Sequence, residues 1–328
     1  MSEPVLQVKG LKTYYYTEEG VVPAVDGLDF EVEPGETFAI VGESGCGKSV
    51  TSLSILRLIP SPPGKIIDGE IIYHGQDLVK KSEREMRSIR GNDISMIFQE
   101  PMTSLNPVFT VEQQIGESFR FHQQMGKAEM LKKSIEMLRL VGIPEPEHVI
   151  NDYPNQLSGG MRQRVMIAMA LACNPKILIA DEPTTALDVT IQAQIMRLLK
   201  QLQEKMGTSI ILITHDLGIV AQIAKHVMVM YCGQAVEYSD VRSIYKNPLH
   251  PYTAGLLRSI PKLTDDDMEE LPSIPGMVPS PSEKLQGCRF APRCEKCGAR
   301  CKKEMPDLVT LEDGRKVRCF LYEGGVEG

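Results

Sequence analysis

Short apolar runs alternate with amphipathic stretches along much of the chain, a pattern typical of α/β proteins. Apolar runs at 36–42 (ETFAIVG), 176–181 (KILIAD) and 209–215 (SIILITH) predict buried strands. The stretch 191–207, between the last two runs, predicts an amphipathic helix. Its apolar side chains share one helical face: Ile191, Ile195, Leu198, Leu199 and Leu202. Strand, helix and strand of these lengths predict a parallel sheet with right-handed crossovers.

The N-terminal part of the chain follows a different pattern. Residues 5–11 and 24–32 alternate apolar and polar positions and carry glycine, which favours antiparallel strands. The stretch 69–78 (GEIIYHGQDL) predicts a hairpin, and residues 100–165 are mostly helical by pattern. We therefore expect an α/β fold in which helices flank a parallel sheet, with an antiparallel N-terminal β subdomain and a helical subdomain.

The amino-acid composition changes near residue 261. The acidic run TDDDMEE is followed by a proline-rich segment, which is typical of a linker or an extended chain. A cysteine-rich stretch follows the prolines. We therefore divide the 328 residues into a large domain at 1–260 and an extension at 261–328.

Charge and hydropathy narrow the classes of function. The formal net charge of −7 argues against a broad surface for nucleic acid. The sequence has no secretory signal pattern and no run of about 18 apolar residues, so we expect no membrane span within this chain. Its eight cysteines would then meet a reducing cytosol, where disulfides are not expected.

The segment GESGCGKS (42–49) has the spacing of a P-loop, with a predicted strand before it and a helix after it. Glycines let successive backbone N–H groups turn toward a phosphate chain, and the helix points its positive end at the same anion. Lys48 would reach the β- and γ-phosphates of ATP, and Ser49 would bind Mg²⁺. The predicted nucleotide-binding residues are Gly42, Glu43, Ser44, Gly45, Cys46, Gly47, Lys48, Ser49 and Val50.

Two carboxylates, Asp181 and Glu182, end the apolar run ILIADE. An acidic pair after a strand is a weak signal alone, but beside a P-loop it indicates a hydrolytic site. Asp181 would hold Mg²⁺ through water, and Glu182 would orient and polarise the attacking water.

The run LSGGMRQR (157–164) resembles the signature sequence of ABC-type ATPases. Small residues at the start of a helix expose N–H groups to an anion, which makes Ser158, Gly159 and Gly160 a second phosphate-binding element. The resemblance spans residues 5–260, with further motifs in the order of the family. It implies a head-to-tail dimer in which the P-loop of one subunit and the signature of the other enclose each ATP.

The same resemblance implies roles for four further residues. Gln99 would contact Mg²⁺ and the attacking water and sense a membrane partner. His215 would hydrogen-bond the γ-phosphate, and Asp188 would communicate across the dimer. Tyr15 would stack on the adenine, with Tyr14 and Tyr16 as alternatives in the run YYY.

Three stretches resemble the ATPase subunits of bacterial dipeptide and oligopeptide importers: 98–111, 181–195 and 250–261. Nickel importers use close relatives, so nickel or another solute is the alternative cargo. The resemblance implies two transmembrane permease subunits, a second identical or paralogous ATPase subunit, and indirectly an extracytoplasmic peptide-binding protein. It also implies a peripheral location at the cytoplasmic face of the cell membrane.

Four cysteines of the extension, Cys288, Cys294, Cys301 and Cys319, resemble a motif of these importer ATPases that can hold a [4Fe–4S] cluster. Cys297 is additional and forms a C-x-x-C pair with Cys294, a spacing that also suits zinc. Thiolates suit both metals, and a tail without metal is a third possibility. We expect the metal to stabilise a tail too small to build its own core.

The sequence fits two other classes of function less well. ABC proteins of DNA repair separate their P-loop and signature by a long coiled coil, and translation-type members usually carry two P-loops. A soluble iron–sulfur ATPase that is not coupled to a membrane is the remaining alternative.

Overall fold

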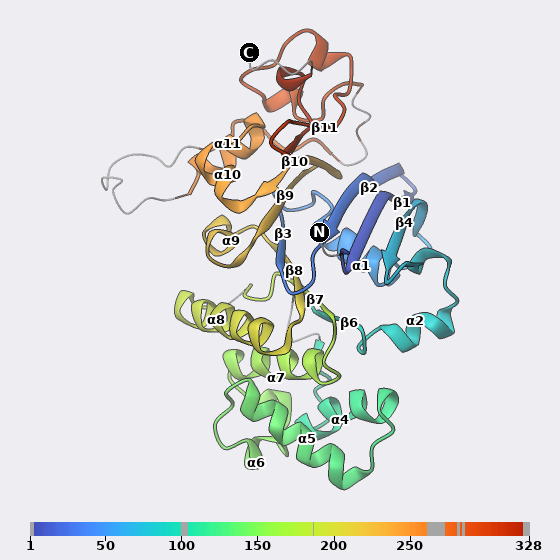
Figure 1. Ribbon diagram of the computed structural model, residues 1–328, viewed down its shortest axis with the longest axis vertical. Helices are drawn as coiled ribbons and strands as arrows, with labels where there is room; N and C mark the ends of the chain where they lie inside the picture. The colour runs from blue at the N-terminus through green and yellow to red at the C-terminus, as the bar shows by residue number, and fades with distance from the viewer. Residues whose placement is uncertain are drawn as a thin grey trace. The chain divides into compact units, whose positions relative to one another are not determined.

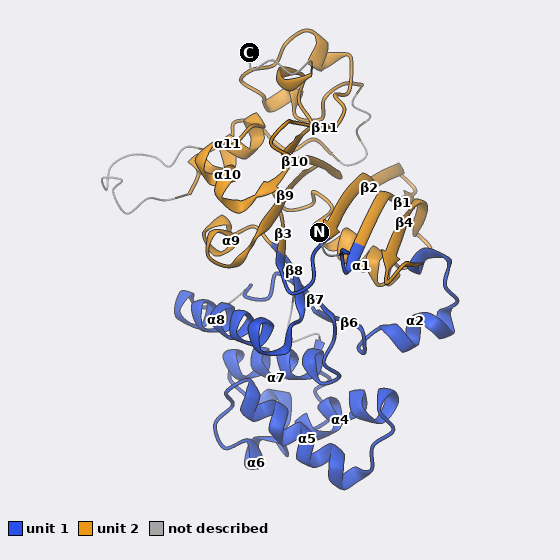
Figure 2. Ribbon diagram, in the orientation of Figure 1, with its two compact units in different colours: residues 1–6, 32–37, 77–213 blue, residues 7–31, 38–76, 214–328 orange. Residues whose placement is uncertain are grey.

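The computed structural model describes residues 3–99, 104–185, 187–260, 273–280, 283 and 286–323. The chain forms two compact units, shown in Figure 2. Unit 1 contains residues 1–6, 32–37 and 77–213, and unit 2 contains residues 7–31, 38–76 and 214–328. Each unit is described by itself.

Unit 1 contains three parallel strands that are neighbours in the order β8-β7-β6. They are β6 (Ile94–Ile97), β7 (Ile177–Asp181) and β8 (Ser209–Thr214). Ile179 of β7 lies opposite Met96 of β6 and Ile211 of β8. Every residue of β7 and β8 is buried, which explains why these strands appear in the sequence as continuous apolar runs. The predicted parallel arrangement is confirmed.

The helices of unit 1 are α2 (Glu83–Ile89), α4 (Val111–His122), α5 (Lys127–Leu140), α6 (Pro146–Val149), α7 (Gly159–Leu171) and α8 (Val189–Met206). Helices α4, α5 and α7 pack on one another, so the predicted helical part of the chain is confirmed for its described residues (Figure 1). Gly207 ends α8 in the left-handed conformation, as predicted. Among the described residues no helix has both the length and the hydropathy needed to cross a bilayer.

A four-stranded sheet occupies the N-terminal part of unit 2, in the order β2-β1-β4-β5. Its strands are β1 (Leu6–Thr17), β2 (Gly20–Val32), β4 (Gly64–Tyr73) and β5 (Gln76–Asp77). The predicted hairpin joins β4 to β5 through His74 and Gly75, both with positive φ. A two-residue turn of this kind matches the twist of the paired strands.

Unit 2 also contains five further strands that are neighbours in the order β11-β12-β10-β9-β3. Its strands are β3 (Thr37–Val41), β9 (His226–Tyr231), β10 (Gln234–Asp240), β11 (Val309–Thr310) and β12 (Lys316–Val317). Only the β3–β9 pair is parallel among the pairs described here. The helices are α1 (Lys48–Ile55), α9 (Leu217–Ile223), α10 (Val241–Lys246) and α11 (Pro251–Arg258).

The C-terminal extension is part of unit 2 and shares its core (Figure 1). Strand β12 pairs with β10, and Arg318 N–H donates to Val236 O. Phe290 is buried against the rings of Tyr231 and Tyr252. Residues on both sides of the boundary at 260 therefore belong to one compact unit, while residues 261–272 lie outside the described part.

Glu237 of β10 is a fully buried carboxylate that supports the start of α11. It accepts hydrogen bonds of 2.9 Å from the backbone N–H groups of Leu249 and His250. Burial raises the pKa of Glu237, while the two N–H donors lower it. The carboxylate thus satisfies backbone donors that would otherwise be buried without partners.

We predict that Glu237→Ala lowers the free energy of unfolding by about 1–3 kcal/mol, because buried N–H groups lose their acceptor. Urea denaturation followed by circular dichroism measures the loss. Glu237→Gln keeps one acceptor oxygen and should lose less. Glu19→Ala, at an exposed turn residue, is the control and should stay within about 0.5 kcal/mol. An Ala variant as stable as that control would contradict the role of Glu237.

Candidate functional site

The loop between β3 and α1 in unit 2 requires glycine at two positions. Gly42 has φ 153° and Gly47 has φ 103°. A Cβ atom at Gly42 would collide with the carbonyl oxygen of Met230, and one at Gly47 with that of Ala24. The backbones of strands β9 and β2 therefore lie directly against the loop, and only glycine fits at positions 42 and 47.

Lys48 begins α1 and is buried with 5% exposure. Its Nζ donates to the carbonyl oxygens of Gly42, at 2.9 Å, and Glu43, at 3.0 Å. The ammonium group therefore lies against the glycine-rich loop that precedes α1. Ser49 and Val50 lie in the first turn of α1, where backbone N–H groups have no helical acceptor. This arrangement can bind a phosphate chain.

Cys46 is a buried loop residue with 2% exposure, and burial raises the pKa of its thiol. Its carbonyl oxygen accepts 2.9 Å from Gly233 N–H, so the turn between β9 and β10 supports the loop. Cys46 is therefore a small packed side chain, and its backbone makes the contacts.

The three candidate tyrosines lie near the end of β1. Tyr14 donates 2.7 Å from its hydroxyl to Asp26, and burial with this hydrogen bond raises the pKa of Tyr14 to about 12. Tyr15 is half-buried, and burial raises its pKa. Tyr16 is 52% exposed. All three remain candidates for the stacking ring. His215, exposed, follows the last residue of β8.

Unit 1 brings together two residues that are far apart in sequence. Gln99 follows β6 and donates 2.9 Å from Nε2 to Oε2 of Glu182. Thr185 donates 2.9 Å to the same oxygen. Glu182 has φ 45°, a strained conformation for a residue with a side chain. Asp181, the last residue of β7, is buried with 4% exposure.

Ser158 is the N-cap of α7, and its hydroxyl accepts 3.3 Å from Met161 N–H. A Cβ at Gly160 would lie 3.2 Å from Ile191, so its small size lets α7 approach α8. Asp188 caps α8 by accepting 2.9 Å from Ile191 N–H. This capping role of Asp188 was missed in the sequence, although an aspartate before a helical run is a known capping signal.

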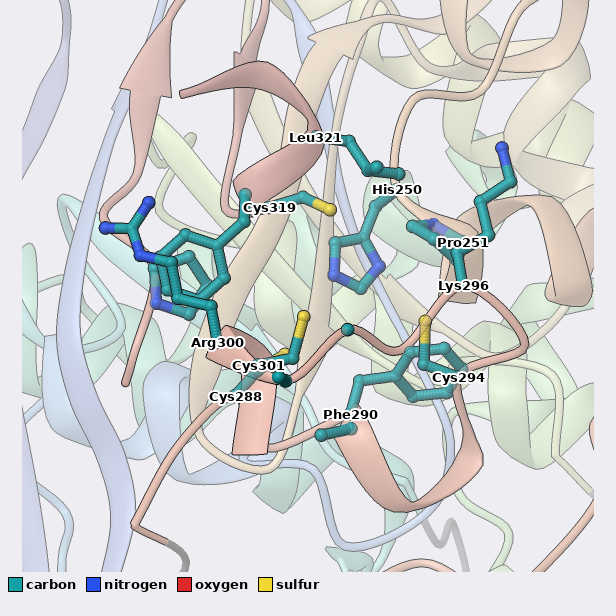
Figure 3. A pocket seen from close by; sticks show the side chains of 15 residues that line it. His250, Pro251, Cys288, Phe290, Cys294, Lys296, Arg300, Cys301, Cys319 and Leu321 are labelled. Carbon is teal, nitrogen blue, oxygen red and sulfur yellow. The ribbon is translucent and has the colours of Figure 1, made fainter. Parts of the chain in front are cut away.

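Four cysteines of the extension line one cavity of about 210 Å³ (Figure 3). They are Cys288, Cys294, Cys301 and Cys319, and Cys297 is not among the lining residues. Burial raises the pKa of three of these thiols, that of Cys319 to about 11. All eight cysteines are free. Among the described residues no group of three or more His, Cys, Asp or Glu side chains is arranged around a single metal ion.

His250 also lines this cavity, with its ring centre 5.6 Å from that of Phe290. It caps α11, with Nδ1 accepting 3.1 Å from Tyr252 N–H. Burial lowers the pKa of His250 to about 3, so the ring is neutral at pH 7. Because Nδ1 is an acceptor, the ring proton lies on Nε2.

Sequence reasoning also missed two ion pairs that join the extension to the rest of unit 2. Arg293 pairs with Glu43 of the glycine-rich loop, and Arg289 pairs with Asp26 of β2. The members of each pair are more than two hundred residues apart, so no local pattern signals them.

Comparisons with known proteins agree with this arrangement of motifs. The sequence profile of ABC transporters matches residues 25–185, and that of the oligopeptide/dipeptide transporter C-terminal region matches residues 236–301. The oligopeptide transport ATP-binding protein AppD of Bacillus subtilis is 55% identical over 97% of each chain. The dipeptide transport ATP-binding protein DppD of the same organism is 51% identical, over 99% of this chain and 97% of its own.

A solved structure has the same cassette architecture. It is a dimeric ATP-binding cassette in a post-hydrolysis state, bound to ADP and Pi. It is 30% identical to this chain, with a TM-score of 0.65. The match covers 72% of this chain and 99% of that one.

Proposed function

Because the chain belongs to the ATP-binding proteins of oligopeptide and dipeptide ABC transporters, we propose that Glu182, oriented by Gln99, activates the water that hydrolyses ATP. The chain is an ABC-type ATPase, and its hydrolysis of ATP in a cassette dimer drives peptide import. ATP and Mg²⁺ are expected for this family. The observation that carries the residue assignment is the 2.9 Å hydrogen bond between Gln99 and Glu182.

Unit 2 supplies the nucleotide-binding groups in this proposal. Backbone N–H groups of the glycine-rich loop and the first turn of α1 hold the phosphates, and Lys48 neutralises the β- and γ-phosphates. The N–H of Glu43 itself donates to Tyr252. The side chain of Ser49 binds Mg²⁺. His215 hydrogen-bonds the γ-phosphate, and Tyr15 stacks on the adenine, with Tyr14 and Tyr16 as alternatives.

Unit 1 supplies the hydrolytic groups. Asp181 and Gln99 would hold Mg²⁺, which would neutralise charge on the phosphates, and Gln99 would also contact the attacking water. Glu182 accepts hydrogen bonds from Gln99 and Thr185 at one oxygen, Oε2. These two hydrogen bonds fix the orientation of the carboxylate, which serves as the base for the water. The strained backbone at Glu182 supports such a role, because strained residues gather at active sites.

The N-terminus of α7 supplies a second phosphate-binding element. Ser158, Gly159 and Gly160 open this helix, and its first turn contains no acidic residue. We place them on the ATP of the second ATPase subunit, with Asp188 communicating across the dimer. The dimeric cassette reported above supports two chains working together.

ABC ATPases of this family work with membrane permeases. We place this chain at the cytoplasmic face of the cell membrane, against two permease subunits that receive peptides from an extracytoplasmic binding protein. Exposed apolar side chains on unit 1, at Val108, Phe109 and Phe121, support a protein contact there. The reported relatives are peptide transport proteins, which favours a peptide over nickel as the cargo.

We propose that the cysteine-lined cavity holds a [4Fe–4S] cluster rather than zinc. Four thiols surround a space of about 210 Å³, whereas a single Zn²⁺ needs four sulfurs converging at about 2.3 Å. Apolar rings around the thiols would shield a cluster from water. Cys288, Cys294, Cys301 and Cys319 would hold it, with Cys297 outside. Such a cluster would supply the cross-links that a small tail lacks, and we assign it no step in hydrolysis.

We predict that Glu182→Gln lowers ATP turnover roughly 10²–10⁴-fold, because a well-placed base contributes about that factor. ATP binding should persist, since the amide keeps the shape of the carboxylate. Phosphate release and binding of a fluorescent ATP analogue measure the two effects. Thr185→Val is the matched comparison, which removes one hydrogen bond to Glu182 and keeps its charge; it should lose far less activity. Near-normal turnover in the Gln variant would exclude Glu182 as the base.

Mixing two inactive variants tests the shared site. Lys48→Ala and Ser158→Arg should each be inactive alone. A mixed dimer contains one doubly damaged site and one intact site, so part of the ATPase activity should return on mixing. Turnover of the mixture, with dimer formation checked by light scattering, measures the recovery. Formation of mixed dimers without recovery would count against a site shared between subunits.

We predict that anaerobically purified protein is brown and contains iron and labile sulfide. Changing any one of the four lining cysteines to serine should bleach it and expose the tail to proteolysis. Cys297→Ser is the matched control within the same segment and should stay brown. Iron and sulfide assays with limited proteolysis check these outcomes. Stoichiometric zinc without sulfide would rule out the cluster.

A further inference from the structure

The glycine-rich loop contains an acidic residue, and the cysteine-rich tail neutralises it. Arg293 donates from Nη1 to Oε2 of Glu43 at 2.7 Å and from Nη2 to Oε1 at 3.0 Å. This is a two-bond fork between a guanidinium and a carboxylate, the strongest common geometry for such a pair. Glu43 is the second residue of the loop, and Arg293 lies 250 residues later.

The Arg293 side chain is held firmly in place. It is 4% exposed, and it also donates from Nε to Pro275 O at 3.1 Å and from Nη2 to Ile274 O at 3.3 Å. Its guanidinium lies 5.9 Å from the ring centre of Tyr231. Two hydrogen bonds to backbone carbonyls therefore hold the guanidinium in place, and two more join it to the carboxylate of Glu43. A mobile surface arginine has no such support.

Other contacts fix the same loop from the same part of unit 2. Glu43 N–H donates 2.9 Å to the hydroxyl of Tyr252. Arg289 donates to Cys232 O, next to Gly233, whose N–H donates to Cys46 O at 2.9 Å. Arg289 and Arg293 lie between Cys288 and Cys294. This part of the tail therefore contacts the loop directly through Glu43 and indirectly through the turn at Cys232 and Gly233.

An acidic side chain in a loop that binds phosphates has an electrostatic consequence. A carboxylate close to a triphosphate repels it, and the repulsion is strong where water is partly excluded. The fork with Arg293 cancels that charge from the tail side. Without the arginine, Glu43 would carry an unpaired negative charge within the phosphate-binding loop.

We propose that Arg293 is a positioning residue for the nucleotide: it neutralises and anchors Glu43, so that the cysteine-rich tail sets the affinity of the P-loop for phosphates. The inference rests on the proposed function of this loop. It gives the tail a role in nucleotide binding that does not require a redox reaction.

The test measures binding of ATP, ADP and adenosine to the full-length protein. Arg293→Met should weaken ATP binding on the order of tenfold, the ratio expected when a nearby charge is left unpaired. The loss should be smaller for ADP and near zero for adenosine, because the repulsion acts on phosphate charge. It should also shrink at high salt.

The double variant Glu43→Gln/Arg293→Met decides between charge and structure. Both charges are absent in it, and the substitution at Glu43 leaves the backbone of the loop unchanged, so ATP affinity should recover most of what Arg293→Met loses. Arg293→Lys, which keeps the charge and loses the fork, should fall between the extremes. Arg258→Met is the matched control, because Arg258 pairs with Glu295 of the same tail while both side chains are exposed. It should bind ATP normally.

Two results would overturn the inference. Arg293→Met binding all three ligands normally would remove Arg293 from nucleotide positioning. Equal loss for ATP and adenosine, without rescue in the double variant, would show that the arginine only maintains the fold of the tail. Failure of the unaltered protein to bind ATP would instead contradict the proposed function, so the two failures are distinguishable.

Discussion

The close approach of backbone to the glycine-rich loop is the constraint on which much of unit 2 depends. Carbonyl oxygens of Met230 and Ala24 lie where side chains at Gly42 and Gly47 would have to be. The loop can therefore keep its curvature only with glycine at these positions, and the curvature directs backbone N–H groups inward. Strands β2 and β9, which supply those carbonyls, are thus part of the binding structure as well as of the core.

Charge balance around the same loop connects it to the C-terminal tail. Lys48 donates to the carbonyl oxygen of Gly42, and Arg293 neutralises Glu43. An acidic residue in a loop that holds a polyanion is less unfavourable when a buried cation compensates its charge. The tail supplies that cation from a segment between two cysteines that line one cavity. The stability of this small appendage and the electrostatics of the nucleotide site are therefore linked physically.

In unit 1, strand pairing and hydrogen bonds set the positions of the hydrolytic residues. Parallel strands β6 and β7 end side by side, which brings Gln99 to Glu182 although 83 residues separate them. Two donors on one carboxylate oxygen fix the side chain before any substrate arrives. The signature segment gains its anion-binding character from the start of α7, where Ser158 caps the helix and glycines leave the backbone accessible.

Local patterns by themselves determined the strands, the helices, the glycine-rich loop and the acidic pair after β7, because period, turn residues and capping are properties of neighbours in sequence. The predicted hairpin at His74–Gly75 and the helix end at Gly207 were confirmed for this reason. Only the tertiary structure decided that β12 joins β10 and that Arg293 meets Glu43. It also brought the four cysteines of the importer-like motif to the lining of one cavity. Such contacts form only when segments that are distant in sequence pack on one core. The residues next to each partner in the sequence therefore do not indicate them.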